Sequence, residues 1–167
     1  YFLNKADLTH RANPKVLIIG ATGSVGTSAI LLAQHHEADI TAVCSTEGSG
    51  LVKSLGVEKL VLYDQEGFSR LSQTYDIIFD AVGKTAKHEC KYLLNAGGVY
   101  INVNTSGFAS EKVEQLELLK KLYEQGKYPA VIDKVFPLEQ VVEAHRYVDT
   151  GRKKGNVVLN IGDREMI

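Results

Sequence analysis

The sequence predicts an α/β protein built on a doubly wound parallel sheet with helices on both faces. Short apolar runs, typical of strands that are buried on both sides, alternate along the chain with segments of helical periodicity. One such run, residues 16–19, leads through a glycine-rich turn directly into a helical segment, and residues 39–43 return as a second strand. A strand, a helix and a parallel strand in succession form a right-handed crossover, and repeating this unit builds a parallel sheet covered on both faces.

The other elements follow from hydrophobic spacing and from turn residues. A short lead-in helix within residues 1–13 is separated from the first strand by the turn at Asn13 and Pro14. Strands are predicted at residues 16–19, 39–43, 59–62, 75–79, 99–103, 130–136 and 156–161. Helices are predicted at residues 24–36, 50–55, 84–94, 113–123 and 137–148, the fourth on a stripe of Val113, Leu116, Leu119 and Leu122. Because no linker, repeat or low-complexity segment interrupts the pattern, residues 1–167 are predicted to form a single domain that ends in the helix and strand of residues 137–161.

Composition and charge narrow the class of protein. With 44% hydrophobic and 23% charged residues, the chain is long enough and apolar enough for one hydrophobic core. A formal net charge of -1 argues against nucleic acid or an anionic membrane as the main partner, and no apolar run approaches the roughly 20 residues that span a bilayer. Cys44 and Cys90 lack CxxC spacing, so we expect reduced, packed thiols in a cytoplasmic protein and no structural zinc. Because the first residue is Tyr1 and not methionine, we expect a fragment or a processed product.

The glycine turn after the first strand predicts a dinucleotide site. The glycines are spaced Gly20-x-x-Gly23-x-x-Gly26, and glycine lets a chain reverse and approach a phosphate closely. The helix that begins near Ser24 would direct free backbone N–H groups and the positive end of its dipole at a pyrophosphate. A glycine turn between a strand and a helix can also be purely structural, so its meaning depends on the residues around it.

The end of the second strand bears on the choice of cofactor. Proteins that bind NAD place an aspartate or glutamate there, about 20 residues after the glycine turn, to accept hydrogen bonds from the ribose. Here the strand ends in Val43-Cys44-Ser45-Thr46, so no carboxylate blocks a 2′-phosphate and two hydroxyl groups are ready to donate to one. Glu47 follows at once and opposes a phosphate, and a Ser-Thr pair after a strand is equally typical of a helix cap. NADP(H) is favoured, and NAD(H) stays open as the alternative.

Several motifs in a fixed order resemble the cofactor domain of a medium-chain dehydrogenase/reductase, which is a Rossmann fold. They are the glycine turn, Ser45-Thr46, Asp80-Ala81-Val82-Gly83, Ala96-Gly97-Gly98 and the tail from Phe136-Pro137-Leu138-Glu139 to Leu159. The chain is most similar to the zinc-independent, quinone oxidoreductase-like branch of that family. The resemblance implies an oxidoreductase, without a metal, that transfers hydride between NADP(H) and a small quinone, enone or carbonyl substrate.

The resemblance also implies a set of cofactor-binding residues and no catalytic residue. The glycine turn would surround the pyrophosphate, Ser45-Thr46 would lie at the adenosine ribose, and Tyr63 near the adenosine half. The ends of the fourth and fifth strands would flank the ribose and the nicotinamide. The full set is Thr22, Gly23, Ser24, Val25, Gly26, Ser45, Thr46, Tyr63, Val82, Gly83, Asn102 and Asn104. Asp80 is expected either to hydrogen-bond locally or to meet a ribose.

The chain departs from the family in three places. The family has an N-terminal GroES-like domain that supplies most of the substrate pocket, and without it we expect weak NADPH binding and no turnover. Family members also pair their sheets in a homodimer through an extra loop and strand, whereas Asn104 here leads directly to Val113; either the protein is naturally shorter or residues are missing. The tail has Asn156 where the family often has lysine. The basic residues before it either supply a charge instead or form a solvated turn; they are Arg152, Lys153 and Lys154.

Other functions fit parts of the sequence. A protein of this fold that binds or senses NADP(H) without catalysis would carry the same motifs. Ser110, Tyr123 and Lys127 also copy the Ser-Tyr-Lys set of short-chain dehydrogenases, in which the lysine lowers the pKa of the tyrosine. Against that alternative, Tyr123 continues the apolar stripe of its helix, which should turn it toward the core. A methyltransferase that uses the glycine turn for another nucleotide is a third alternative.

Overall fold

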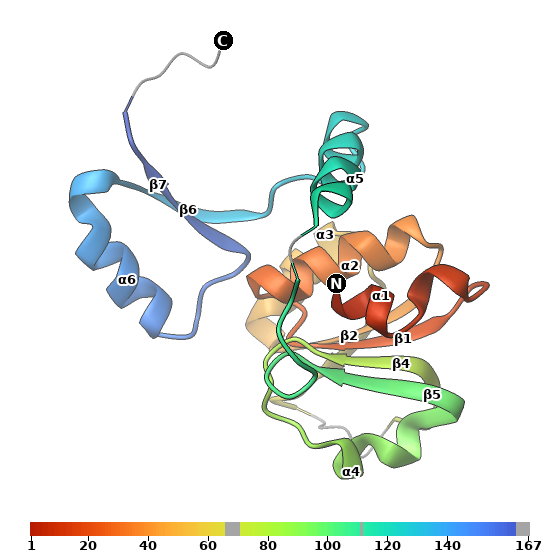
Figure 1. Ribbon diagram of the computed structural model, residues 1–167. Helices are drawn as coiled ribbons and strands as arrows, with labels where there is room; N and C mark the ends of the chain where they lie inside the picture. Colours follow the sequence, from red (N-terminus) through yellow and green to blue (C-terminus); the bar gives the residue numbers. More distant parts are fainter. Residues whose placement is uncertain (66–70, 111, 163–167) are drawn as a thin grey trace.

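The main sheet has five parallel strands and confirms the predicted α/β fold. The computed structural model describes residues 1–65, 71–110 and 112–162. The strands are β1 (Lys15–Ile19), β2 (Asp39–Cys44), β3 (Lys59–Leu62), β4 (Tyr75–Asp80) and β5 (Leu94–Asn102). They lie in the order β3-β2-β1-β4-β5, and all neighbouring pairs are parallel (Figure 1). The winding reverses between β1 and β4, which is the place where ligands bind in doubly wound sheets.

Helices cover both faces of this sheet because successive side chains of a buried strand point to opposite sides. The helices are α1 (Phe2–Lys5), α2 (Ser24–His35), α3 (Ser49–Ser54), α4 (Lys87–Cys90), α5 (Val113–Glu124) and α6 (Val141–Asp149). Val16 and Ile18 of β1 belong to one core with side chains of α1, α2 and α3, whereas Leu17 and Ile19 belong to a second core on the α4 side. Figure 1 shows α2 and α4 on opposite sides of the sheet. Cys44 and Cys90 are buried free thiols, as predicted.

Two predicted elements between β4 and β5 differ in the structure. The helix predicted at residues 84–94 is only α4 and the 3-10 turn Lys91–Leu93. The backbone N–H and the hydroxyl of Thr85 donate to the Asp80 carboxylate at 2.8 and 2.6 Å, so the chain wraps around this side chain before a helix can begin. The strand predicted at residues 99–103 begins earlier, so that Gly97 and Gly98 lie inside β5. Gly97 has φ +75°, and the pairing with β4 changes register nearby, so the strand contains a bulge-like irregularity.

The last two predicted strands form, but in a separate sheet. β6 (Ile132–Pro137) and β7 (Asn156–Asn160) pair in parallel, with α6 and the 3-10 turn Leu138–Gln140 between them (Figure 1). We call residues 132–160 the β6–α6–β7 unit. The segment before β7 meets the main sheet at the glycine turn, where the N–H of Gly155 donates to the carbonyl of Thr22 at 2.7 Å. Gly23 and Gly155 form an isolated parallel bridge at the same point.

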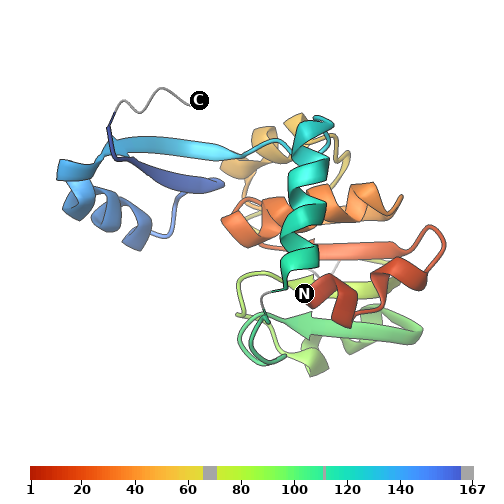
Figure 2. The same cartoon turned by 45° about the horizontal axis from the view of Figure 1, so that its top comes forward.

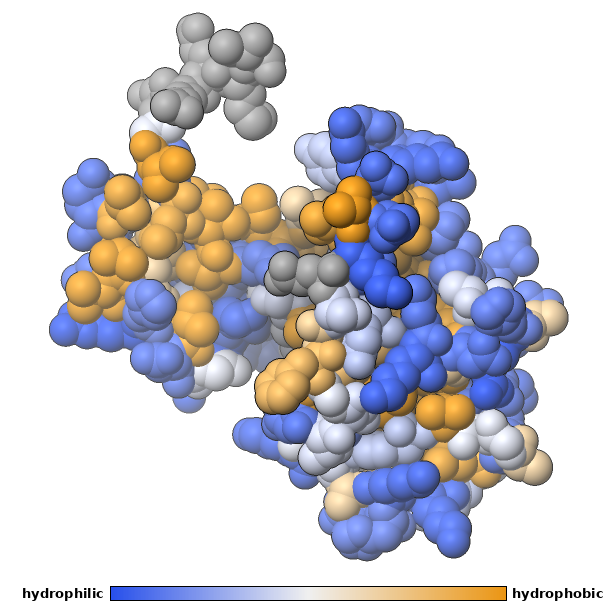
Figure 3. Space-filling model, in the orientation of Figure 1, coloured by the Kyte–Doolittle hydropathy of each residue, from blue (hydrophilic) through white to orange (hydrophobic). Residues whose placement is uncertain are grey.

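The β6–α6–β7 unit exposes apolar side chains. Ile132 and Val135 of β6 are 49% and 57% exposed, and Val142 of α6 is 52% exposed. Figure 3 shows a broad apolar patch over the unit. The described part of the chain leaves this patch open to solvent. Among the described residues, no helix is long and apolar enough to cross a membrane.

Helix α5 turns inward a face that overlaps only in part with the one the sequence predicts. Of the predicted stripe only Leu122 is fully buried, at 2% exposed, while Val113 and Leu116 are 67% and 65% exposed. Leu119, which also belongs to the predicted stripe, lines an apolar cavity of about 180 Å³ together with Gln115 and Leu118, and α5 shares this cavity with α1 and α2. Figure 2 shows α5 lying across α2. The four leucines of α5 fit two overlapping helical stripes, and packing against α1 and α2 decides which stripe is buried.

Asp133 of β6 forms hydrogen bonds with α6 and with the segment before β7. Its Oδ2 accepts a hydrogen bond from the Tyr147 hydroxyl of α6 at 2.6 Å and one from the Lys154 N–H at 3.0 Å. Partial burial alone would raise the pKa of Asp133, but these hydrogen bonds and the charges of Lys134 and Lys154 outweigh it, so the pKa lies below the ordinary value. Because the pKa of Asp133 is lowered in the folded state, this carboxylate stabilises the fold fully at pH values above the unfolded pKa, about 3.9. That stabilisation is lost as the pH falls through the folded pKa.

We therefore expect Tyr147→Phe to raise the pKa of Asp133 toward its ordinary value, because the phenol hydrogen bond favours the carboxylate. Carboxyl-carbon NMR titration of both proteins measures this shift. Tyr128→Phe, a change outside the unit, is the control and leaves the Asp133 titration unchanged. Equal Asp133 pKa values in the wild type and Tyr147→Phe would show that the phenol does not act on this carboxylate.

Candidate functional site

The first turn of the site depends on Gly20, the residue after β1. Gly20 has φ +78°, in the left-handed region that favours glycine. A Cβ at Gly20 would also lie 2.1 Å from Cγ2 of Val82, so the ends of β1 and β4 approach closely here. The N–H groups of Gly20 and Ala21 both donate to the carbonyl of Val43 at 3.1 Å, which ties the turn to the end of β2. The turn is thus fixed between three strand ends.

The start of α2 is open toward the solvent side of this turn. Gly23 is the N-cap residue, and a Cβ there would meet only the carbonyl oxygen of Gly20, at 3.9 Å. The first N–H groups of an α-helix have no partner inside the helix, and Gly23 has no side chain with which to cap them. Together with the positive end of the helix dipole they attract an anion. Gly26 lies on the opposite side, where the helix touches the backbone of Gly20 and Ala21.

The polar groups at the end of β2 have more hydrogen-bond partners within the chain than the sequence predicts. Ser45 Oγ accepts the N–H of Gly48 at 3.2 Å and so caps the 3-10 turn Thr46–Gly48, which bears out the capping alternative and leaves its hydroxyl proton free to donate. Thr46 does not offer a free hydroxyl: its Oγ1 donates to Asp64 at 3.1 Å, and its N–H donates to the same carboxylate at 3.0 Å. The expectation of two ready hydroxyl donors is therefore wrong for Thr46.

Asp64 is the residue that sequence reasoning missed. It follows β3, and β2 pairs with β3 in parallel, so the residues after both strands meet at one edge of the sheet. That neighbourhood is the signal that could have found it. Tyr63, the residue before it, is 58% exposed at the same edge, and its N–H donates to the carbonyl of Cys44 at 3.1 Å. The structure thus brings Ser45, Thr46 and Tyr63 together.

The ends of β4 and β5 are joined by a buried polar network centred on Asp80. Its carboxylate accepts the N–H groups of Val82 and Gly83 at 3.0 and 2.8 Å, besides both Thr85 bonds and the Asn102 amide at 3.2 Å. Asp80 is fully buried and Asn102 is 2% exposed. Of the two roles expected for Asp80, the structure therefore shows the local one. Asn102 Oδ1 in turn accepts the N–H of Asn104 at 2.8 Å and so positions that exposed residue.

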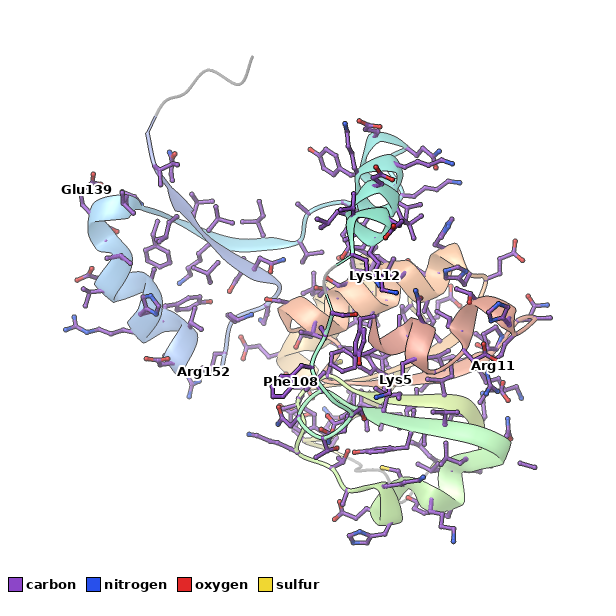
Figure 4. The ribbon with its side chains drawn as sticks, in the orientation of Figure 1. Lys5, Arg11, Phe108, Lys112, Glu139 and Arg152 are labelled. Carbon is purple, nitrogen blue, oxygen red and sulfur yellow. The ribbon has the colours of Figure 1, made fainter. Side chains whose placement is uncertain are left out.

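The basic tail reaches the glycine turn. Lys153 Nζ donates to Ser24 Oγ at 2.6 Å and to the Gly155 carbonyl at 2.8 Å, across 129 positions of sequence in the first case. Lys154 Nζ forms an ion pair with Glu47 at 2.8 Å. The hydrogen bond and the charge of Lys154 lower the pKa of Glu47. Arg152, by contrast, is exposed beyond the C-terminal end of α6 (Figure 4).

The Ser-Tyr-Lys alternative receives no support. Tyr123 is 63% exposed on α5, so the expectation that it faces the core is wrong, because α5 buries the neighbouring stripe instead. Ser110 and Lys127 are exposed as well. Within residues 1–65, 71–110 and 112–162, no group of three or more His, Cys, Asp or Glu side chains is placed to hold a metal ion.

Known proteins resemble this chain in sequence and in structure. A family model described as "Zinc-binding dehydrogenase" matches residues 105–159. The 2-methylene-furan-3-one reductase of Solanum lycopersicum is 35% identical over 155 residues, which cover 87% of this chain and 40% of that protein. The NADPH-dependent alkenal/one oxidoreductase of the Arabidopsis thaliana chloroplast is 32% identical over 159 residues, covering 89% of this chain and 41% of that protein.

A solved structure extends the likeness to the fold. The quinone oxidoreductase from Coxiella burnetii superposes with a TM-score of 0.85 at 25% identity, over 96% of this chain and 56% of that one. The chain spans less than half the length of the two sequence relatives. Fold, motif order and relatives agree with the predicted family. The chain belongs to the medium-chain dehydrogenase/reductase family, with quinone oxidoreductase-like relatives, and is a partial cofactor-binding domain of that family.

Proposed function

We propose that this chain binds NADP(H) for an oxidoreductase that passes hydride between the nicotinamide and a quinone, an enone or a carbonyl compound. The family supplies the reaction class. The observation that carries the cofactor part is the uncapped start of α2 at Gly23, beside the point where the sheet reverses its winding. The name of the Arabidopsis relative, which specifies NADPH and alkenal/one substrates, supports both the nucleotide and the substrate class.

Under this proposal, each strand end holds one part of the nucleotide. The N–H groups of residues 24–26 bind the pyrophosphate, and Gly23 leaves room for it. Ser45 and Tyr63 lie at the adenosine half, and Val82 and Asn104 at the ribose and nicotinamide. Asp80 and Asn102, both buried, keep these loops in place without touching the cofactor.

Bound NADP(H) supplies the hydride, and the residues of this chain bind and orient it. Substrate contacts and proton donors belong, in this proposal, to other parts of a longer enzyme, of which these residues form one dinucleotide-binding domain. We accordingly expect the 167-residue chain to bind NADPH without reducing enones or quinones, which is also what a non-catalytic NADP(H)-binding protein would do. A full-length protein that binds NADPH but turns over none of these substrates would favour the non-catalytic alternative. A homodimer stays a prediction. A cytoplasmic location also stays a prediction, and the Arabidopsis relative is named as chloroplastic.

The direct test is nucleotide titration of the 167-residue chain. NADPH binding is followed by the fluorescence of the reduced nicotinamide, which is excited at wavelengths that protein side chains do not absorb. A ligand that binds only the folded state at 100 times its Kd stabilises it by about 2.7 kcal/mol, which raises the Tm of a chain of this size by about 5–10 °C. We expect both signals with NADPH.

Gly23→Asp is the matched variant. Gly23 has φ -77° and an open Cβ direction, so the fold accepts the side chain, and an aspartate N-cap stabilises α2 by a few tenths of a kcal/mol. The same carboxylate occupies the N–H groups and repels a pyrophosphate, so NADPH no longer shifts the Tm. A wild-type chain that responds to neither NADPH nor NADH at millimolar concentration would overturn the proposal.

A further inference from the structure

Two consecutive lysines lie across the glycine turn, one at each end. Lys153 reaches the start of α2 through Ser24 Oγ, and Lys154 reaches Glu47, which lies just after Ser45 and Thr46 at the end of β2. Both lysine side chains are half-buried. They therefore stand at the two places where the proposed cofactor would carry its negative charges.

The backbone that presents these lysines is fixed on both sides. The Lys154 N–H donates to Asp133 at 3.0 Å, and the N–H of the next residue, Gly155, donates to the Thr22 carbonyl at 2.7 Å. Gly155 has φ +78°, and a Cβ there would lie 2.5 Å from the backbone oxygen of Val131. The segment is thus held by specific contacts and is not a solvated turn.

The two lysines differ in what neutralises them. The hydrogen-bond acceptors of Lys153 are a hydroxyl and a backbone carbonyl, both of them neutral, so its positive charge is not compensated by these contacts. Lys154 is paired with the carboxylate of Glu47 at 2.8 Å. An ammonium group carries three protons, so Lys154 can keep Glu47 and still donate to a further anion. Without Lys154, the 77% exposed Glu47 side chain would present an unpaired negative charge at the ribose end of the site.

We propose that Lys153 binds the pyrophosphate common to NADP(H) and NAD(H), and that Lys154 binds the 2′-phosphate found only in NADP(H) while masking Glu47. This inference rests on the proposed function, since it assigns two residues to the same nucleotide site. It explains how a strand end with no arginine, and with carboxylates at Glu47 and Asp64, can still accept NADP(H).

The test measures Kd for NADPH and NADH with Lys153→Met and Lys154→Met in the 167-residue chain. Because a charge-assisted hydrogen bond is lost, we expect Lys154→Met to weaken NADPH binding about tenfold or more and to leave NADH within about twofold. Lys153→Met weakens both nucleotides by similar factors. Glu47→Gln strengthens NADPH binding and leaves NADH unchanged, because it removes a repulsion that only the 2′-phosphate meets.

Lys120→Met removes an equal charge from an exposed side chain of α5 that pairs with Glu124, and so controls for net charge. The ligand-free Tm of each variant controls for folding. If Lys153→Met fails to fold, Lys153→Arg replaces it and is expected to keep its affinity for both nucleotides. If Lys154→Met fails to fold, Lys154→Gln replaces it and is expected to lose affinity for NADPH. Equal losses for NADPH and NADH in Lys154→Met would overturn its assignment, and wild-type affinities in Lys153→Met would overturn the other. If the wild type binds both nucleotides normally while the lysine variants match it, only this inference fails. If the wild type binds neither, the proposed function fails first.

Discussion

Gly26→Ala is expected to destabilise the protein by roughly 3 kcal/mol, the upper end of what overpacking a filled site costs. A Cβ on Gly26 would lie 2.1 Å from the carbonyl oxygen of Gly20 and 2.8 Å from Cα of Ala21. These neighbours are backbone atoms, and the turn they belong to is fixed by the hydrogen bonds of Gly20 and Ala21 to Val43. Neither side can give way, so α2 must move from the end of β1.

Urea unfolding of the wild type and Gly26→Ala measures the loss, and we expect the NADPH response to disappear with it, since α2 and the turn form one site. Gly50→Ala is the matched control. Gly50 lies in α3, and a Cβ there meets no atom within 4 Å. Alanine in that open helical position stabilises the fold by about 0.5–1 kcal/mol. A Gly26→Ala protein as stable as Gly50→Ala would contradict the close approach of α2 to the turn.

Asp80→Asn is expected to cost about 3 kcal/mol or more, although it changes only one atom. Oδ1 accepts two backbone N–H groups, and Oδ2 accepts the N–H and hydroxyl of Thr85 and the amide of Asn102. Whichever way the new amide turns, its NH2 group faces at least two donors in a fully buried site. Hydrogen bonds to a charged group contribute about 1.5–3 kcal/mol each, and leaving buried donors unsatisfied adds to the loss.

Chemical unfolding also measures this variant, and the matched control is Asp39→Asn. Asp39 lies at the start of β2 and pairs with the exposed Lys59 at 2.6 Å. Such surface pairs contribute about 0–1 kcal/mol. If the two variants lost equal stability, the Asp80 network would not be holding the ends of β4 and β5.

The sequence predicts the parts of this fold that depend on local pattern. The run at residues 16–19 gives a buried strand because each of its residues is apolar, and Val16, Leu17 and Ile18 are completely buried in the structure. The glycines from Gly20 to Gly26 predict the turn between the strand and the helix, and Gly20 adopts the left-handed conformation that glycine favours. The close contact of Gly26 with the backbone of the turn comes from the structure alone. The motif order along the chain also leads to the family.

The parts that were missed depend on contacts between distant segments. Four leucines of α5 fit two helical faces, and only packing on α1 and α2 decides which is buried. The hydrogen bond from Thr46 to Asp64 depends on the pairing of β2 with β3, which brings the residues after both strands together. The bulge at Gly97 needs the register between β4 and β5.

By itself, then, the sequence determined the alternation of strands and helices, the glycine turn and the family, because hydrophobic period and glycine conformation act within a few residues. Only the tertiary structure decided that β6 and β7 leave the main sheet and that Lys153 and Lys154 lie over Ser24 and Glu47. Those contacts join residues 129 and 107 positions apart. Their geometry is set by strand pairing and by the hydrogen bonds of Asp133 and Gly155, which no local pattern encodes.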